Sequence, residues 1–326
     1  MVTAIEPLLR EQLIDRRNKL EAAANGFTQA TEVLRLLAEV DSALNRMELG
    51  TYGLCDVCHD PVETERLIAN PLTRLCIDHL SAPELRALED DLTLAAQIQN
   101  GLLPQPSQKI DGWEIAYHYQ PAGIVSGDYC DVIRGDDDSV LFVLGDVSGK
   151  GVAASMLMAH LQAMFRTLIS SRLPLEQMLE RASRVFCEST LPTHYATLVC
   201  GKTTTSGAVE ICNAGHLPPL LFHQGAVKNI NSTALPIGVF SNEHFGVSKF
   251  QLEKGDTILL YTDGLSEALN GDGNEYGIDR LAQVLKINCE MTPRALLGAC
   301  VEDALSFTAN RIPTDDVTLM AIRRTH

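Results

Sequence analysis

The spacing of apolar residues predicts helices in the first hundred residues of the chain. Two segments on either side of Asn25-Gly26 carry helical stripes, the first with Leu9, Leu13, Leu20 and Ala24, and the second with Val33, Leu37, Val40, Leu44 and Met47. The alternating steps of four and three in the second stripe are those of a heptad seam, so residues 1–47 are predicted to form an antiparallel helical hairpin. Two amphipathic helices that pack on another surface are the alternative.

A linker helix is predicted over residues 81–104. Ser81 and Glu84 have capping-box spacing, Pro104 ends the pattern, and Leu94 and Ile98 widen an apolar stripe made of Leu85, Leu88, Leu92, Ala95, Gln99 and Leu102. This stripe has two interpretations. Either it mediates dimerisation or transmits a conformational change, or it packs on the domain that follows.

From residue 105 onward, short apolar runs alternate with turns rich in Gly and Asp. The runs predict strands over 113–120, 139–146, 196–202, 208–214, 256–263 and 317–324, and helical stretches lie between them near 151–171, 175–189, 277–287 and 293–307. Strands in antiparallel succession with helices in separate blocks indicate an α+β domain over residues 105–326, in which helices flank two sheets.

Composition and charge narrow the class of protein. A chain of 326 residues with 45% hydrophobic side chains can bury the cores of about two domains. The 42 acidic residues outnumber the 26 basic ones and give a formal charge of −16, which disfavours nucleic acid and anionic lipid as partners. The chain starts without a basic segment before an apolar run and has no apolar stretch of about 18 residues, so we expect a cytoplasmic protein.

Residues 48–80 contain too few aliphatic side chains to fold on apolar burial alone. Cys55 and Cys58 form a C-x-x-C pair, and Cys76 and His79 repeat that spacing. Four soft ligands in this arrangement indicate one structural Zn²⁺, with His59 as an alternative fourth ligand. A redox-active pair is the other interpretation, although no βαβ pattern surrounds it.

The segment GTYGLCDVCHDPVETERLIANPLTRLCIDHL, residues 50–80, resembles the DksA/TraR-type zinc finger in its G-T-Y-G entry, its E-R-L segment and its final C-I-D. In that family the finger often accompanies a coiled coil whose acidic tip enters RNA polymerase. The hairpin turn of this chain, EAAANGFTQA, lacks the paired aspartates of that tip.

Acidic residues stand at the ends of four predicted apolar runs. Asp146 ends VLFVLGD, Asp263 ends TILLYTD, the pair Asp315-Asp316 precedes VTLMAI, and Asp128 and Asp131 follow AGIVSG. Carboxylates brought together in a partly desolvated site repel one another unless a cation neutralises them. Oxygen ligands of this kind suit Mg²⁺ or Mn²⁺, so we expect the acids to converge on a divalent metal site.

The remaining cysteines are expected to be reduced core residues, and none lies in a C-x5-R loop that would make it a nucleophile: Cys130, Cys187, Cys200, Cys212, Cys289 and Cys300. Two further residues have open roles. His216 in NAGH is either a proton donor or a structural histidine, and Lys150 in GDVSGKG either meets a phosphate or is a solvated helix-start lysine. The spacing of that loop does not fit a P-loop.

Residues 105–326 resemble the SpoIIE/RsbU branch of the PPM, or type 2C, metal-dependent phosphatases. The pieces that carry the resemblance occur in family order: SGDYCD, GDVSGKGVAASMLMA, YATLVCG, NAGHLPPLL, LPIGVF, GDTILLYTDGLSEALN and DDVTLMAIR. The preceding AAQIQNGLLPQ resembles the regulatory linker helix of that branch. The resemblance implies a four-layer α-β-β-α sandwich and a protein serine/threonine phosphatase, often one that acts on a STAS-fold anti-sigma-factor antagonist.

The resemblance also implies a ligand set. Asp146 would bridge two Mg²⁺ or Mn²⁺ ions beside the Val147 carbonyl, Asp263 and Asp315 would complete one ion, and Asp128 would serve the second. Asp315 is preferred to Asp316 because it takes the first place of the family's D-[DN]-x-T ending, and Asp131 is a weaker candidate than Asp128. The N-terminal module is expected to regulate the enzyme, while a non-catalytic scaffold or a polymerase-binding regulator that acts through finger and hairpin is the alternative.

Overall fold

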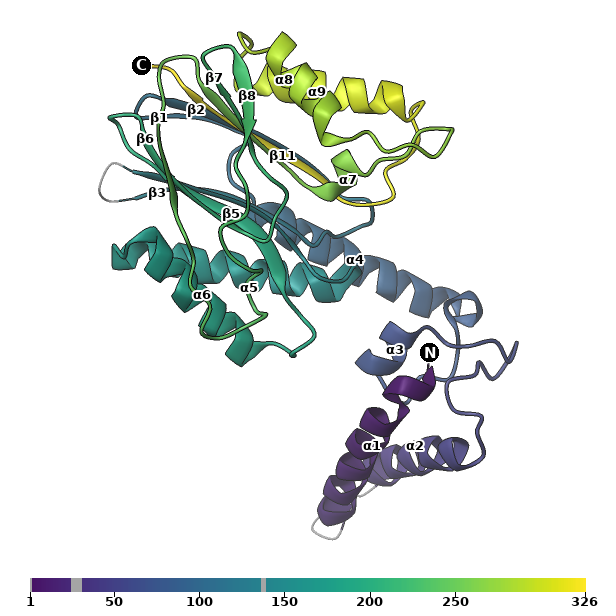
Figure 1. Cartoon of the computed structure of the whole chain (residues 1–326). Helices are drawn as coiled ribbons and strands as arrows, with labels where there is room; N and C mark the ends of the chain where they lie inside the picture. The colour runs from purple at the N-terminus through teal and green to yellow at the C-terminus, as the bar shows by residue number, and fades with distance from the viewer. Residues whose placement is uncertain (1, 25–30, 136–138) are drawn as a thin grey trace. The chain divides into compact units, whose positions relative to one another are not determined.

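The structure is a computed structural model that describes residues 2–24, 31–135 and 139–326. Contacts divide the chain into two compact units, residues 1–91 and 92–326 (Figure 1). The first unit contains α1 (Val2–Ala24), α2 (Thr31–Glu48), α3 (Thr64–Ala69) and the 3-10 helix η1 (Ile77–His79), and α4 (Ala82–Leu102) runs across the boundary.

The first unit has one apolar cluster. Leu9 and Leu13 of α1 pack with Val40 and Met47 of α2, as the predicted seams require, and the same cluster continues into the finger through Tyr52, Cys55, Val62, Leu67 and Cys76. The hairpin helices and the finger therefore share a core. The predicted Asn25-Gly26 turn lies outside the described residues.

The second unit is built on two antiparallel sheets. The first sheet has the order β1-β2-β11-β10-β7-β8 and the second has the order β3-β4-β5-β6-β9. Their strands are β1 (Ser107–Ile110), β2 (Trp113–Gln120), β3 (Asp128–Arg134), β4 (Val140–Val147), β5 (Ala196–Thr203), β6 (Ala208–Ala214), β7 (Leu220–His223), β8 (Ala226–Asn229), β9 (Ser248–Gln251), β10 (Thr257–Tyr261) and β11 (Val317–Arg324).

Helices cover the outer face of each sheet. They are α5 (Gly151–Leu168), which continues as the 3-10 helix η2 (Ile169–Ser171), α6 (Leu175–Ser189), α7 (Asp263–Ser266), α8 (Ile278–Ile287) and α9 (Pro293–Phe307). One apolar cluster fills the space between the sheets around Trp113, Phe142 and Met320. A second lies under α8 and α9 and a third under α5 and α6. The predicted α-β-β-α sandwich and α+β class are confirmed.

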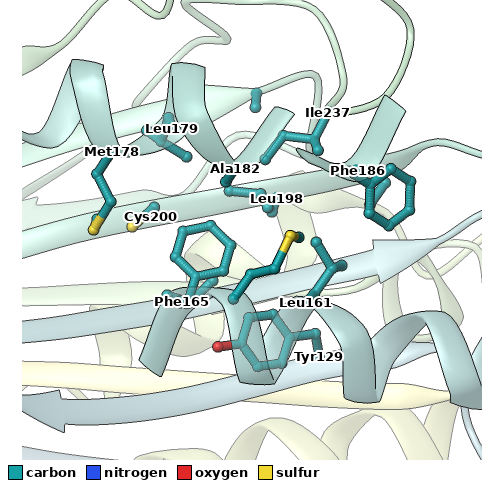
Figure 2. Packing of buried hydrophobic residues seen from close by; sticks show 14 of the residues in the cluster. Tyr129, Leu161, Phe165, Met178, Leu179, Ala182, Phe186, Leu198, Cys200 and Ile237 are labelled. Atoms are coloured by element: carbon teal, nitrogen blue, oxygen red, sulfur yellow. The ribbon is translucent and has the colours of Figure 1, made fainter. Parts of the chain in front are cut away.

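The apolar composition of helix α5 is explained by its packing in the cluster under α5 and α6. Residues Gly151–Ser171 are long and apolar enough to cross a membrane by length and composition. Met158, Leu161 and Phe165 are nevertheless buried in the cluster against the second sheet, where Phe165 stacks on Tyr129 with ring centroids 5.9 Å apart (Figure 2). The composition of α5 is therefore that of a core helix packed on a sheet.

Candidate metal centres

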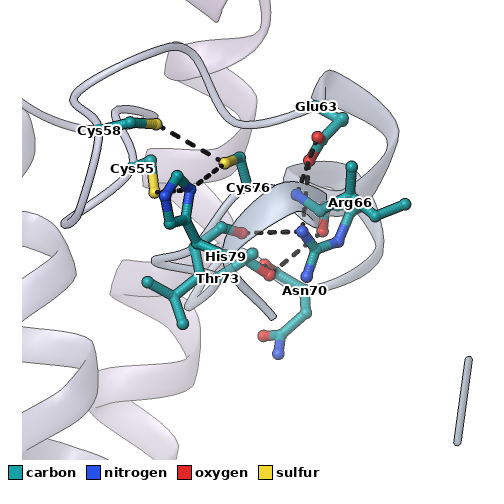
Figure 3. Close-up of polar contacts among 10 residues, drawn as sticks. Cys55, Cys58, Glu63, Arg66, Asn70, Thr73, Cys76 and His79 are labelled. Atoms are coloured by element: carbon teal, nitrogen blue, oxygen red, sulfur yellow. Dashed lines mark hydrogen bonds and ion pairs between the residues drawn. The ribbon is translucent and has the colours of Figure 1, made fainter. Parts of the chain in front are cut away.

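Two short turns bring the four predicted zinc ligands together in the first unit. One ligand atom each of Cys55, Cys58, Cys76 and His79 lies within 4.8 Å of all the others. His79 Nδ1 is 3.1 Å from Cys76 Sγ and 3.8 Å from Cys55 Sγ (Figure 3). His59, the alternative ligand, is exposed and is not part of this group. Three sulfurs and an imidazole nitrogen are the donors of a closed structural zinc site.

A polar network holds the second turn of the finger in place. Arg66 donates to the Leu75 carbonyl at 2.7 Å and lies 3.3 Å from Glu63, and Glu63 accepts the backbone N–H of Ile77 at 3.0 Å (Figure 3). These contacts fix the backbone on both sides of Cys76. Such outer contacts orient metal ligands before the metal binds.

Cys55 is the ligand that the finger prepares most for metal binding. Burial raises the pKa of its thiol, but backbone N–H groups of Cys58, Cys76 and Val57 lower the pKa more, to about 6. The thiolate is the form that binds a metal, so at neutral pH one ligand of the finger is already charged.

The predicted acids of the second unit lie at one end of the two sheets. Asp128 begins β3 and stands directly opposite Asp146, near the end of β4, in the antiparallel register. Asp263 follows β10 and begins α7, and Asp315 precedes β11, the strand that pairs with β10. Each carboxylate is thus positioned by a strand end, two from each sheet.

Close backbone packing brings these segments together. A Cβ on Gly264 would lie 2.1 Å from the Asp316 carbonyl oxygen, so only glycine allows α7 to rest against the segment that holds Asp315. A Cβ on Gly127 would lie 3.2 Å from the Val147 carbonyl oxygen and 3.4 Å from Asp146 Oδ1. The predicted carbonyl ligand therefore faces the same narrow space as the Asp146 carboxylate.

Two threonines that the sequence analysis missed join the sheets at this end. The hydroxyls of Thr262 and Thr318 both donate to Asp128 Oδ2, the first at 3.0 Å, and Asp128 is 1% exposed. Thr262 adjoins Asp263, and Thr318 is the threonine of the D-D-V-T segment, so their adjacency to predicted acids was the signal available in the sequence. They hold Asp128 across the sandwich.

The two neighbouring acids before β11 have different surroundings. Both oxygens of Asp316 accept backbone N–H groups, from Ala122 at 2.8 Å and from Gly127 at 2.9 Å, which makes Asp316 a loop anchor. Asp315 instead has a half-exposed side chain and lies 2.7 Å from Lys150 Nζ. Lys150 therefore contacts a predicted ligand, a role that neither interpretation of its sequence position included.

Burial and mutual repulsion perturb the acids. Burial, followed by the charges of Asp263, Asp315 and Asp316, raises the pKa of Asp146 to about 7. Burial and then Asp315 raise the pKa of Asp263. Burial raises the pKa of Asp128 well above its usual range although Thr318 opposes the shift. Oxygen donors that repel one another in a partly buried site fit a divalent cation.

The acids do not yet form one coordination sphere. In the described part of the chain, the finger ligands are the only group of three or more Cys, His, Asp or Glu residues whose ligand atoms lie within 4.8 Å of one another. Convergence of these acids on a metal site stays a prediction. Asp315 is drawn toward Lys150 and Asp128 toward the two threonines, so the carboxylates share one end of the sandwich at wider separations.

A cleft of about 360 Å³ opens beside Asp146 and Asp263, and its other walls are Ser148, Tyr195, Thr197, Gly215, His216, Leu217, Pro218 and Glu267. His216 lies in this wall with both ring nitrogens engaged. Its Nδ1 is 2.9 Å from the Thr197 hydroxyl and its Nε2 is 3.1 Å from the Tyr261 carbonyl oxygen. Burial lowers the pKa of His216 to about 4, so the ring is neutral at pH 7 and holds the end of β10 beside Asp263.

Asp131, the weaker candidate ligand, has a structural partner. It is fully buried, and its two oxygens accept hydrogen bonds from Arg166 Nε and Nη2 at 2.9 and 2.8 Å. The scattered cysteines Cys130, Cys200, Cys212 and Cys300 are buried and unbridged, as predicted, and burial raises the pKa of each thiol. Cys187 and Cys289 are unbridged but only partly buried, so the prediction that they are core residues is wrong. Neither Asp131 nor these thiols lines the cleft.

Comparisons with known proteins agree with both halves of this description. The family profile of Stage II sporulation protein E (SpoIIE) matches residues 136–325, and that of the prokaryotic DksA/TraR C4-type zinc finger matches residues 50–78. The second match ends one residue before His79, which stands where a C4 finger has its fourth cysteine. The finger of this chain is therefore a Cys3His variant of that type.

Two curated relatives match far more of this chain than the finger alone. The chain is 26% identical to Protein IcfG of Synechocystis sp. over 72% of this chain and 41% of that protein. It is 23% identical to phosphoserine phosphatase RsbU of Bacillus subtilis over 73% of this chain and 71% of RsbU. The chain thus spans less than half of IcfG.

Solved structures share the fold of the second unit. The RsbU and RsbW domains of a Mycobacterium tuberculosis protein align with a TM-score of 0.58 at 29% identity, over 68% of this chain and 63% of that one. The SiaA-PP2C domain of Pseudomonas aeruginosa aligns with a TM-score of 0.65 at 20% identity, over 74% of this chain and 99% of that one. The chain belongs to the SpoIIE family, with a PP2C-like phosphatase fold and an N-terminal finger of the DksA/TraR type.

Proposed function

We propose that the protein is a Mg²⁺- or Mn²⁺-dependent protein serine/threonine phosphatase. The observation that carries the proposal is the cleft at the end of the two sheets, which Asp146 and Asp263 both line with raised pKa values. RsbU, which the chain resembles over 73% of its length, is named a phosphoserine phosphatase. The substrate class is phosphoserine or phosphothreonine on a bacterial signalling protein, such as a STAS-fold anti-sigma-factor antagonist.

The proposed ligand set is the one that the resemblance to the PPM phosphatases implies. Asp146 and the Val147 carbonyl would hold two ions, Asp263 and Asp315 would complete one of them, and Asp128 would serve the other. Bound divalent cations make water a nucleophile at neutral pH and neutralise phosphoryl oxygens. A cation held by Asp315 would compete with Lys150, which lies 2.7 Å from that carboxylate in the metal-free protein.

The protein's own residues shape the rest of the reaction. His216 is neutral and uses both nitrogens, so it orients the β10 end and does not donate a proton near pH 7. Buried thiols with raised pKa values are poor nucleophiles, which leaves direct attack by water on the phosphoryl group as the route the site supports. No phosphoenzyme is required.

The N-terminal module has a proposed regulatory role. One Zn²⁺ bound by Cys55, Cys58, Cys76 and His79 would stabilise the finger, and the boundaries at 47/48, 80/81 and 104/105 would separate hairpin, finger, linker helix and phosphatase domain. Leu94 and Ile98 of α4 are 55% and 59% exposed, which favours a homodimer formed through the linker helix. We place the protein in the cytoplasm, with no membrane or nucleic acid partner.

Hydrolysis of para-nitrophenyl phosphate and of a phosphoserine peptide, with and without Mn²⁺, tests the activity. Asp146→Ala and Asp263→Ala should each lower kcat at least about 1000-fold, since each removes a predicted metal ligand. Asp272→Ala, an exposed acid outside the cleft, is the matched control. Unchanged turnover in either site variant would overturn the assignment and favour the non-catalytic scaffold.

The dimer has a separate test. Replacing the exposed Leu94 and Ile98 of α4 by glutamate should give monomers in light scattering, and dimers that persist would place the contact elsewhere.

A further inference from the structure

A second cavity adjoins the segment that carries Asp263. It has a volume of about 210 Å³ and lies entirely within the second unit. Gly264 and Leu265 of α7 line this cavity, whereas Asp263 and Glu267 line the acidic cleft, so one short segment contributes to both spaces. The remaining walls come from the segment after α7 (Ala268 and Leu269), from α9, from the loop between α9 and β11, and from the ends of β2 and β11.

The chemistry of the walls is apolar. Val301 and Ala304 of α9 and Leu265 of α7 line the cavity with apolar side chains, and the Thr308 hydroxyl already donates to the Leu305 carbonyl. At the rim, Ile312 is 84% exposed, an unusual exposure for so large an aliphatic side chain. Apolar cavities of about 150 Å³ bind benzene in other proteins. A cavity of 210 Å³ therefore has room for one ring with a short chain.

The cavity also has one charged group. Arg311 is the only charged residue among those that line it, in a chain with a formal charge of −16. A guanidinium at the rim of an apolar cavity selects a planar anion, because a carboxylate accepts two parallel hydrogen bonds from it. An apolar body and a single carboxylate are the two features that the site complements.

We propose that this cavity binds a small monocarboxylate with an aromatic or branched aliphatic body. The body occupies the space between α7 and α9, and the carboxylate pairs with Arg311. The occupant contacts the segments that lead to Asp263 and to Asp315, through Gly264 and Thr314 respectively. The inference concerns binding and stands independently of the proposed phosphatase activity.

Titration of the full chain, followed by saturation-transfer NMR, tests the proposal with 3-phenylpropionate and its neutral analogue 3-phenylpropanamide. We expect a Kd of about 1 mM for the carboxylate and about tenfold weaker binding of the amide. Arg311→Gln should weaken the carboxylate about tenfold and leave the amide unchanged. Arg294→Gln, an exposed arginine of α9 outside the cavity, should change neither.

Two variants that fill the cavity locate the binding. Val301→Phe fills it from α9 and Ala268→Leu fills it from the segment after α7, and each should abolish binding of both probes while thermal unfolding stays cooperative. Binding that survives in a cooperatively folded filled variant would overturn the site. Absence of binding of either probe to the wild type at 10 mM, or equal affinity for both, would overturn the ligand class.

Discussion

The finger and the acidic cleft both gather metal-ligating side chains, yet different forces hold them. The finger ligands stand on two short turns around a small apolar cluster that the hairpin helices complete. The acids stand on strand ends of a sandwich with three apolar clusters of its own. A metal would thus contribute to folding in the finger, whereas in the cleft the fold exists first and the metal relieves repulsion between carboxylates.

The largest effect is expected from removal of a zinc ligand in the finger. Cys76→Ser removes a ligand that is buried and contacts both Cys58 and His79. Structural zinc contributes about 10 kcal/mol or more to folding in isolated fingers, so we expect residues 48–80 to lose their structure. Trypsin should then cleave within them, and zinc content by mass spectrometry should fall to zero. The second unit should keep its melting temperature, and a lower value would contradict the contrast.

The sandwich should respond instead to a change in its core. Phe165→Ala empties a fully buried position between α5 and the second sheet, next to Tyr129. Such truncations cost about 3–5 kcal/mol. Urea unfolding of the second unit measures this loss. Met156→Ala, on the same helix and 68% exposed, should change the free energy of unfolding little. Equal losses of unfolding free energy in the two variants would show that the cluster around Phe165 does not stabilise the fold.

Arg166→Met sharpens the distinction between acids that bind metal and acids that support the fold. It leaves Asp131 fully buried without its partner, while Arg166 itself is 45% exposed. Because of that exposure, we expect a loss of about 2 kcal/mol in the free energy of unfolding, below the range for fully buried pairs. Mn²⁺-dependent activity below the unfolding temperature should be retained. Arg184→Met, an exposed arginine of α6, is the matched control.

The smallest effect concerns pH in the metal-free protein. The folded state raises the pKa of Asp146 from 3.8 to about 7, so the folded state binds a proton more tightly than the unfolded chain. Protonation of Asp146 should therefore contribute about 1 kcal/mol more stability at pH 6 than at pH 8, whereas His216, whose pKa is lowered in the folded state, acts in the opposite direction. Asp146→Asn should remove this dependence and stabilise the metal-free protein at pH 8. Thermal unfolding in the presence of a chelator at pH 6 and pH 8 measures this pH dependence. The prediction would be contradicted if the wild type and Asp146→Asn showed the same change in stability between the two pH values.

Regular elements with a clear period could be predicted from the sequence. The helices at 175–189 and 293–307 and the strand at 317–324 have the bounds that their periodicity predicted. Strand β3 was missed because five of its seven residues are buried, which leaves no alternation, and because Asp128 and Asp131 resemble turn residues. The edge strands β1, β8 and β9 have four residues each, too few to show a period.

The sequence indicated two of the acids that line the cleft, but not the contacts that the acids make. Acids at the ends of apolar runs identify Asp146 and Asp263 because strand ends fix side chains. The contact between Lys150 and Asp315 joins residues 165 positions apart, and no local pattern contains it. The threonine bridge to Asp128 likewise depends on how one sheet packs on the other, which sequence periodicity does not specify.

The bridge from Thr262 and Thr318 to Asp128 ties the two sheets together at the cleft. Each sheet alone carries only half of the acids. If the proposed site is correct, a truncated or nascent chain with one finished sheet would lack half of the predicted ligands and would not hydrolyse phosphate esters. Turnover would then also show that the two sheets have packed together.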